Sequence, residues 1–248
     1  MTKPDQASCA RAARRVSLLA ALALLWIAPS ARADAVIGNG QAATESRAIG
    51  AFDAIGLSGS IGLQLRQGSP TALVVHADAN LLPMLETVVE GDQLKVRWKH
   101  GTSLRTNSRT WVEVTAPQVR AIASAGSGDV TIDAMKVPRL ALSLQGSGDV
   151  RANALQSDEL SLGIAGSSTV TLAGRAARVS INVSGSGGIE AAELRADDVR
   201  VNIAGSGDAS VHAERALSVS IAGSGNVTYS GDATVQRAIA GSGTVRKR

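Results

Sequence analysis

The chain has 248 residues, of which 44% are hydrophobic and 2% aromatic, and its 25 Lys and Arg against 21 Asp and Glu give a formal net charge of +4. Five basic residues and one acidic residue lie in positions 1–33, so the remaining chain holds 20 of each sign, and composition gives no support for a nucleic-acid-binding protein. The single cysteine, Cys9, lies in the same N-terminal stretch, which excludes disulfides and thiolate metal sites from the rest of the chain.

Residues 1–33 have the three parts of a secretion signal peptide. Arg14 and Arg15 precede an apolar run over 16–28, and Ala31-Arg32-Ala33 is typical of a cleavage site. The apolar run is shorter than the roughly 20 residues that a membrane-spanning helix needs. We therefore predict an exported protein, in the periplasm or at the cell surface, with no transmembrane segment after cleavage.

The next two segments precede any visible repeat. Residues 34–46 are polar and contain Gly and Ala, so we predict a flexible lead-in. Residues 47–117 are predicted to form an N-terminal β segment of short strands. In this segment, Glu90-Gly91-Asp92 separates two short runs typical of strands, at 87–89 and 93–98, and predicts a hairpin.

Residues 118–248 are organised around a repeated Gly-Ser-Gly tripeptide. The copies begin at Gly126, Gly146, Gly166, Gly185, Gly205, Gly223 and Gly241, and the third copy reads Gly-Ser-Ser. Their spacing of 18 to 20 residues predicts a solenoid, in which each coil buries its apolar face against its neighbours.

Apolar residues alternate with polar ones before each of these glycines, as in Leu140, Leu142 and Leu144. This period of two, with branched residues, predicts strands with one buried face. We predict an all-β protein whose repeat half is a single-stranded parallel β-helix of about seven coils; an antiparallel meander is the alternative. Arg120, Ser124 and Arg237 interrupt the apolar register only in the first and last copies, which predicts that these copies are the ends of the stack.

Several short sequences carry a family resemblance. Phe52-Asp53-Ala54-Ile55, the run 77–83, Val89-Glu90-Gly91-Asp92 and the Gly-Ser-Gly-Asp-Val copies at Gly126 and Gly146 resemble the bacterial family called putative auto-transporter adhesin, head GIN domain. The resemblance covers roughly Phe52 to Arg248. It implies an exported, right-handed β-helix with an adhesin-like role, and it implies no catalytic residues.

Acidic residues follow the repeated corners at Asp129, Asp149 and Asp208. Asp129 and Asp149 are weak candidates for a calcium ladder, but Asp after Gly is also an ordinary turn residue, and we favour the turn role. His76, His100 and His212 are widely separated and match no catalytic order. We therefore expect neither an enzyme nor a cofactor; the alternative is a carbohydrate-active enzyme that uses the edge formed by Asp129 and Asp149.

One local concentration of basic residues could meet an anionic surface: Lys95, Arg97, Lys99, His100, Arg105 and Arg109. A solvated hairpin and loop is the simpler interpretation, and we favour it.

The outward positions of the repeats form a predicted flat face of small polar groups. Its candidate ligand-binding residues are Ser161, Ser180, Asn182, Arg200, Asn202, Ser218 and Ser220. Such a face suits a glycan, an envelope protein or a second copy of the chain, although small polar residues also suit a bare solvent face. The sequence thus favours a non-enzymatic binding or structural module of the cell envelope over an assembly or stress factor that binds another protein.

Overall fold

The computed structural model describes residues 35–101 and 103–248, and the predicted signal peptide lies outside them. These residues form strands and one short 3-10 helix, η1 (Leu82–Met84). None of their helices is long and apolar enough to cross a membrane.

The strands fall into two groups along the chain. The first group is β1 (Val36–Ile37), β2 (Ala42–Arg47), β3 (Ala54–Gly59), β4 (Ile61–Gln67), β5 (Ala72–Asp78), β6 (Leu85–Glu90), β7 (Gln93–Trp98), β8 (Leu104–Arg105) and β9 (Thr110–Ala116). The second group is β10 (Ala121–Gly126), β11 (Val130–Gly146), β12 (Val150–Gly166), β13 (Thr169–Gly185), β14 (Gly188–Gly205), β15 (Asp208–Gly223), β16 (Asn226–Ser230), β17 (Thr234–Gly241) and β18 (Thr244–Lys247).

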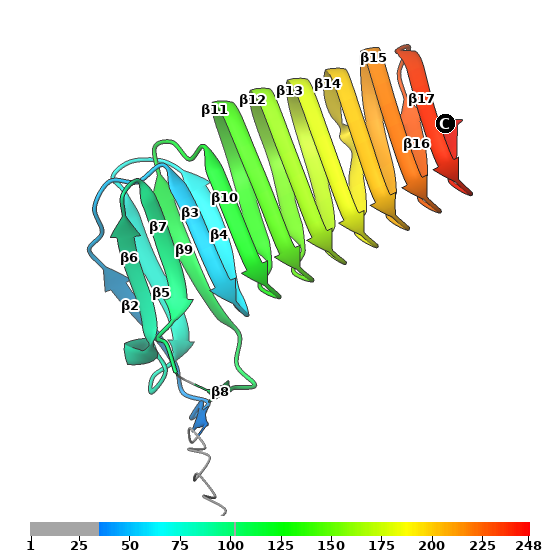
Figure 1. Cartoon of the computed structure of the whole chain (residues 1–248). Helices are drawn as coiled ribbons and strands as arrows, with labels where there is room; N and C mark the ends of the chain where they lie inside the picture. Colours follow the sequence, from blue (N-terminus) through cyan, green and yellow to red (C-terminus); the bar gives the residue numbers. More distant parts are fainter. Residues whose placement is uncertain (1–34, 102) are drawn as a thin grey trace, which may run out of the picture. The chain divides into compact units, whose positions relative to one another are not determined.

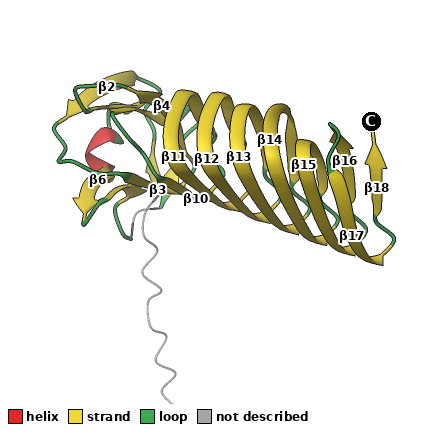
Figure 2. Cartoon of the chain, turned by 90° about the horizontal axis from the view of Figure 1, so that it is seen from above, coloured by secondary structure: helices red, strands yellow, loops and turns green. Residues whose placement is uncertain are grey.

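The second group forms a parallel β-solenoid of about 6 turns, which confirms the predicted fold class. Successive coils pair in parallel and in the repeat register, so Leu142 lies beside Leu162 and Leu162 beside Ile181. The predicted antiparallel alternative is therefore wrong for the repeats. Figures 1 and 2 show β11 to β15 as long curved strands that lie side by side and bend around a common interior.

The core of the solenoid consists of the alternating aliphatic residues that the sequence pattern selected. Leu142, Leu162, Ile181 and Val201 stack in one column and are at most 2% exposed. Burial of each such side chain contributes roughly 1.5–3 kcal/mol, so the stack of columns stabilises the coils against one another.

The same stack continues into the first group of strands. On the side away from β11, β10 pairs in parallel with β3, which brings Gly126 beside Gly59, and β11 also pairs with β4. Beyond them β7 stacks on β3 and β9 on β4, again in parallel. The antiparallel strands β6, β5 and β2 then end the parallel order.

This continuation corrects the interpretation of Arg120 and Ser124 as markers of an end. The copy that contains them has a coil on each side, because β10 lies between β3 and β11. Ser124 is buried, whereas Arg120 is exposed and its guanidinium forms ion pairs with Asp53 and Asp92. Arg120 thus joins the repeat region to the segment before it.

The predicted flexible lead-in over 34–46 is also corrected, because most of it is paired. β1 pairs with β8, and β2 pairs along its whole length with β5. At the end of β2, the Arg47 guanidinium donates hydrogen bonds to the carbonyl oxygens of Leu85 at 2.6 Å and Leu82 at 2.7 Å. Backbone pairing and this partly buried cation hold a polar segment whose composition alone indicates flexibility.

Candidate functional site

A groove of about 920 Å³ crosses successive coils from β10 to β17, and we call it the axial groove. Three columns of residues, each with one member per coil, form most of it. The columns are charged (Arg139, Glu159, Arg178, Asp198), apolar (Leu140, Leu160, Val179, Val199, Leu217) and polar (Ser161, Ser180, Arg200, Ser218, Gln236).

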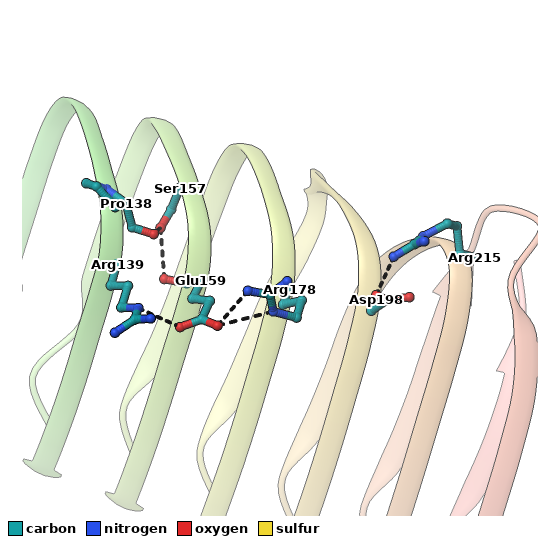
Figure 3. A network of polar contacts seen from close by, with 7 residues as sticks. All are labelled: Pro138, Arg139, Ser157, Glu159, Arg178, Asp198 and Arg215. Carbon is teal, nitrogen blue, oxygen red and sulfur yellow. Dashed lines mark hydrogen bonds and ion pairs between the residues drawn. The ribbon is translucent and has the colours of Figure 1, made fainter.

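The charged column is a ladder of alternating sign, drawn in Figure 3. Glu159 binds a guanidinium on each side, that of Arg139 at 2.9 Å and that of Arg178 at 2.6 Å. Asp198, in the next coil, pairs at 2.6 Å with Arg215, which lies outside the groove lining. Parallel stacking creates these contacts, because it places equivalent positions of adjacent coils about 4.8 Å apart.

The ladder alters the acid strength of its members. The hydrogen bond from Arg178, with the charge of Arg139, holds the pKa of Glu159 below its ordinary value of 4.5. The same hydrogen bond and the charge of Glu159 raise the pKa of Arg178. Glu159 is therefore ionised at neutral pH, and it serves two guanidinium groups, so this part of the groove keeps an excess of positive charge.

The polar column contains four of the residues proposed from sequence, namely Ser161, Ser180, Arg200 and Ser218. Arg200 lies between Ser180 and Ser218 in the adjacent coils. It is exposed, and within the part of the chain that the structure describes it forms no ion pair. The polar column therefore offers hydroxyl groups and one guanidinium that is free to bind an anion.

The remaining proposed residues, Asn182, Asn202 and Ser220, lie in the adjacent outward column and do not line the groove. Asn202 Nδ2 donates a hydrogen bond to Asn182 Oδ1 at 3.0 Å. These amides bind each other across the coils, so the predicted flat face divides into a groove wall and an amide ladder.

Asp129 and Asp149 are engaged in bonds between coils. Asp129 Oδ1 accepts the backbone N–H of Asp149 at 3.2 Å, and Asp149 Oδ1 accepts that of Thr169 at 3.0 Å. No group of three or more His, Cys, Asp or Glu residues that could hold a metal ion occurs within residues 35–101 and 103–248. The arrangement is that of turn residues that bond the next coil.

The predicted basic concentration is partly neutralised. Lys95 pairs with Glu90, Arg97 pairs with Glu86 at 2.7 Å, and Arg109 pairs with Asp129 at 3.1 Å. These pairs favour a solvated hairpin and loop over a dedicated anion surface.

The histidines are bound to different neighbours. His76, on β5, stacks on Trp111 with 3.9 Å between ring centroids, and His212, on β15, contacts Ser230 and Glu214. Each of these contacts is explained by local packing and hydrogen bonding.

The charged column was not predicted from the sequence, although the sequence contains a signal for it. Arg139, Glu159, Arg178 and Asp198 each stand directly before the first apolar residue of their repeat. The alternation of sign at one repeat position indicates contacts between coils, and it becomes visible only when the repeats are aligned on that position.

Comparison with known proteins gives a family and a fold. The family model described as "Putative auto-transporter adhesin, head GIN domain" matches residues 51–233. No protein of curated function matches the chain.

Three solved structures are similar over nearly all of the described chain. A putative adhesin from Bacteroides fragilis shares 24% identity and a TM-score of 0.81, covering 86% of this chain and 100% of its own, which is a likeness of fold. A putative lipid binding protein from Parabacteroides distasonis shares 30% identity and a TM-score of 0.73, covering 86% and 99%. A putative adhesin from Parabacteroides merdae shares 26% identity and a TM-score of 0.69, covering 87% and 99%.

Proposed function

Because this chain belongs to the putative auto-transporter adhesin, head GIN domain family, we propose that it is an exported, non-enzymatic, adhesin-like module that binds an extended glycan in its axial groove. The observation that carries the proposal is the direction of the groove. It runs across the coils, so that a ligand lying in it meets equivalent positions in successive coils, and these positions are polar from Ser161 to Gln236.

The shape of the groove supports a polymer over a compact ligand. A groove that crosses many coils is open along the solenoid axis, and its lining residues fall in columns that continue from one coil to the next. Small metabolites usually bind in enclosed pockets that converge on them. A chain molecule, in contrast, gains affinity by repeating one modest set of contacts along its length.

The use of the acidic residues supports a non-enzymatic role. Glycosidases place two carboxyl groups on opposite sides of the bond that they cleave. In the axial groove, Glu159 and Asp198 are each bound to arginine, and outside it Asp129 and Asp149 accept backbone hydrogen bonds. We place the module in the periplasm or at the cell surface, on the strength of the signal-like composition of residues 1–33.

The test is a binding screen of purified protein against cell-envelope polysaccharides, with two matched variants. Ser180→Leu places a branched side chain in the groove, whereas Asn202→Leu makes a comparable change in the column beside it. We expect Ser180→Leu to weaken glycan binding at least tenfold and Asn202→Leu to leave it nearly unchanged. Equal effects of the two variants, or no glycan binding by the wild type, would contradict the proposal.

The screen includes vesicles of phosphatidylethanolamine and phosphatidylglycerol, because one relative is named a putative lipid binding protein. Binding to vesicles without binding to any glycan would replace the proposed ligand class. Fractionation of cells that express the full chain tests export, and we expect the protein outside the cytoplasm.

A further inference from the structure

We propose that the ligand of the axial groove is an acidic, β-1,4-linked polysaccharide, bound with about one sugar per coil, and that Arg200 binds one of its carboxylate groups. This inference rests on the proposed function and narrows it to one chemical class of glycan.

The spacing of the polar column supports this choice of polymer. Ser161, Ser180 and Arg200 occupy equivalent positions in successive coils, so their backbones repeat about every 4.8 Å along the groove. An extended β-1,4-linked pyranose chain advances by nearly this distance per sugar. An extended peptide advances about 3.4 Å per residue and loses register within a few coils. Since successive β-1,4-linked sugars are inverted relative to one another, such a glycan can place one sugar at each coil and repeat the same contact at every second coil.

The charge of the groove supports an acidic chain. Arg139 and Arg178 share the single carboxylate of Glu159, and Asp198 is neutralised by Arg215 from outside the groove. Arg200 adds a guanidinium that no described carboxylate binds. An anionic ligand would compensate this excess, and a carboxylate matches the two parallel N–H donors of an arginine side chain.

The neighbours of Arg200 can contribute to the same subsite. Ser180 and Ser218 flank it in the coils on either side. Their hydroxyl groups can donate to sugar oxygens next to the carboxylate, while the side chains of the apolar column beneath are at most 4% exposed and belong to the core. The lining contains no aromatic side chain. Since stacking on aromatic rings is a common source of affinity for neutral sugars, its absence from the lining favours recognition through charge and hydrogen bonds.

The experiment compares three sets of oligosaccharides by calorimetry: β-1,4-linked mannuronates, neutral β-1,4-linked glucans and α-1,4-linked galacturonates. The mannuronates have both the linkage and the charge, and each other set lacks one of them. We expect the mannuronates to bind at least tenfold more tightly than either other set. Their affinity should rise with length up to about seven sugars, because Ala121 and Ala141 also line the groove and extend the five positions of the polar column by two coils.

Two variants test whether Arg200 binds a carboxylate group of the ligand. Arg200→Gln should reduce mannuronate binding about tenfold, to the level of the neutral glucans. Arg175→Gln removes another exposed arginine of the same solenoid that does not line the groove, and should leave binding unchanged. Thermal unfolding of both variants should match the wild type, because both side chains are exposed.

The outcomes separate this inference from the proposed function. Equal binding of neutral and acidic β-1,4 chains, with loss of binding in Ser180→Leu, would overturn the inference and leave the proposed function standing. Equal binding of mannuronates and galacturonates, without dependence on length, would overturn the register argument. Failure of every glycan to bind would overturn both.

Discussion

Gly146 lies so close to Gly126 in the preceding coil that a Cβ atom on Gly146 would be 2.1 Å from the Gly126 carbonyl oxygen. Gly146 also has a φ of 131°, a conformation that side-chain-bearing residues rarely adopt. Both constraints arise from one feature, the tight corner at which each coil stacks on the previous one. They explain why the corner repeats glycine even though the neighbouring strands vary.

We expect Gly146→Ala to destabilise the protein by at least about 3 kcal/mol, because it combines backbone strain with a clash against backbone. Gly163→Ala is the control, since the nearest atom to its Cβ would be the Leu142 carbonyl oxygen at 4.0 Å. Urea unfolding followed by circular dichroism measures both. If Gly146→Ala lowered the free energy of unfolding no more than Gly163→Ala does, this result would show that the corner relaxes easily.

The acid after the corner should contribute stability through its oxygen atom. Asp149 Oδ1 accepts the Thr169 N–H at 3.0 Å, so Asp149→Ala should cost about 1 kcal/mol. Asp149→Asn keeps this oxygen, so it should reduce the stability of the fold much less. Asn226 already occupies the equivalent corner position, and its side-chain oxygen accepts a hydrogen bond from Thr244. Calcium should not change the melting temperature of the wild type. A calcium-dependent rise that Asp149→Asn abolishes would instead establish a metal site.

The ladder around Glu159 should make stability depend on pH in the acidic range. The pKa of Glu159 is lowered in the folded protein from 4.5, so its ionised form stabilises the fold. This stabilisation is fully present above pH 4.5 and is lost as pH falls through the lower folded pKa. We expect the difference in melting temperature between wild type and Glu159→Gln to be constant near neutral pH and to shrink below pH 4.5.

Asp158→Asn is the control for this pH dependence, because Asp158 adjoins Glu159 in sequence and acts on Arg178 only through its charge, without an ion pair among the described residues. Its melting temperature should follow the wild type more closely across the same range. If the two variants gave the same pH profile, the ladder would have no specific role in acid stability.

Arg47 should hold the N-terminal strand β2 in place. Its side chain is 15% exposed and bonds the carbonyl oxygens of Leu82 and Leu85, so Arg47→Ala should cost about 2 kcal/mol. Arg47→Lys should recover little of this stability, because a lysine ammonium cannot reproduce the fixed planar arrangement of N–H donors in the guanidinium. Hydrogen exchange should accelerate in β2 and β5, which are paired.

The matched control is Arg66→Ala, which removes a surface ion pair with Asp133 in which Arg66 is 65% exposed. Pairs of this kind contribute about 0–1 kcal/mol. Unchanged exchange in β2 after Arg47→Ala would mean that backbone pairing alone orders this segment.

The sequence by itself determined the solenoid, because the constraint on each coil is local and repeated. Leu140, Leu142 and Leu144 show an alternation that only a strand with one buried face explains, and the glycine at each corner fixes the period. These signals recur in every coil, so they can be recognised without knowledge of distant contacts. The same repetition made the polar column with Ser161, Ser180 and Ser218 predictable.

Only the tertiary structure decided how the repeats join the preceding segment. Gly59 occupies the same column as Gly126, but residues 68–120 separate β4 from β10, so the period is broken along the chain while it persists in space. For the same reason, the sequence pattern predicted that Arg120 marks an end of the stack, although Arg120 lies between two coils. Burial of the apolar face of β10 requires a neighbour, and sequence spacing does not say which distant strand supplies it.

The candidate site was likewise completed by contacts between coils. Glu159 and Arg178 are 19 residues apart in sequence, yet their side chains meet at 2.6 Å because parallel stacking superimposes their positions. A charge at one position carries no indication of its partner until the register is known. The sequence therefore identified which residues face outward, and the stacking decided which of them form a groove.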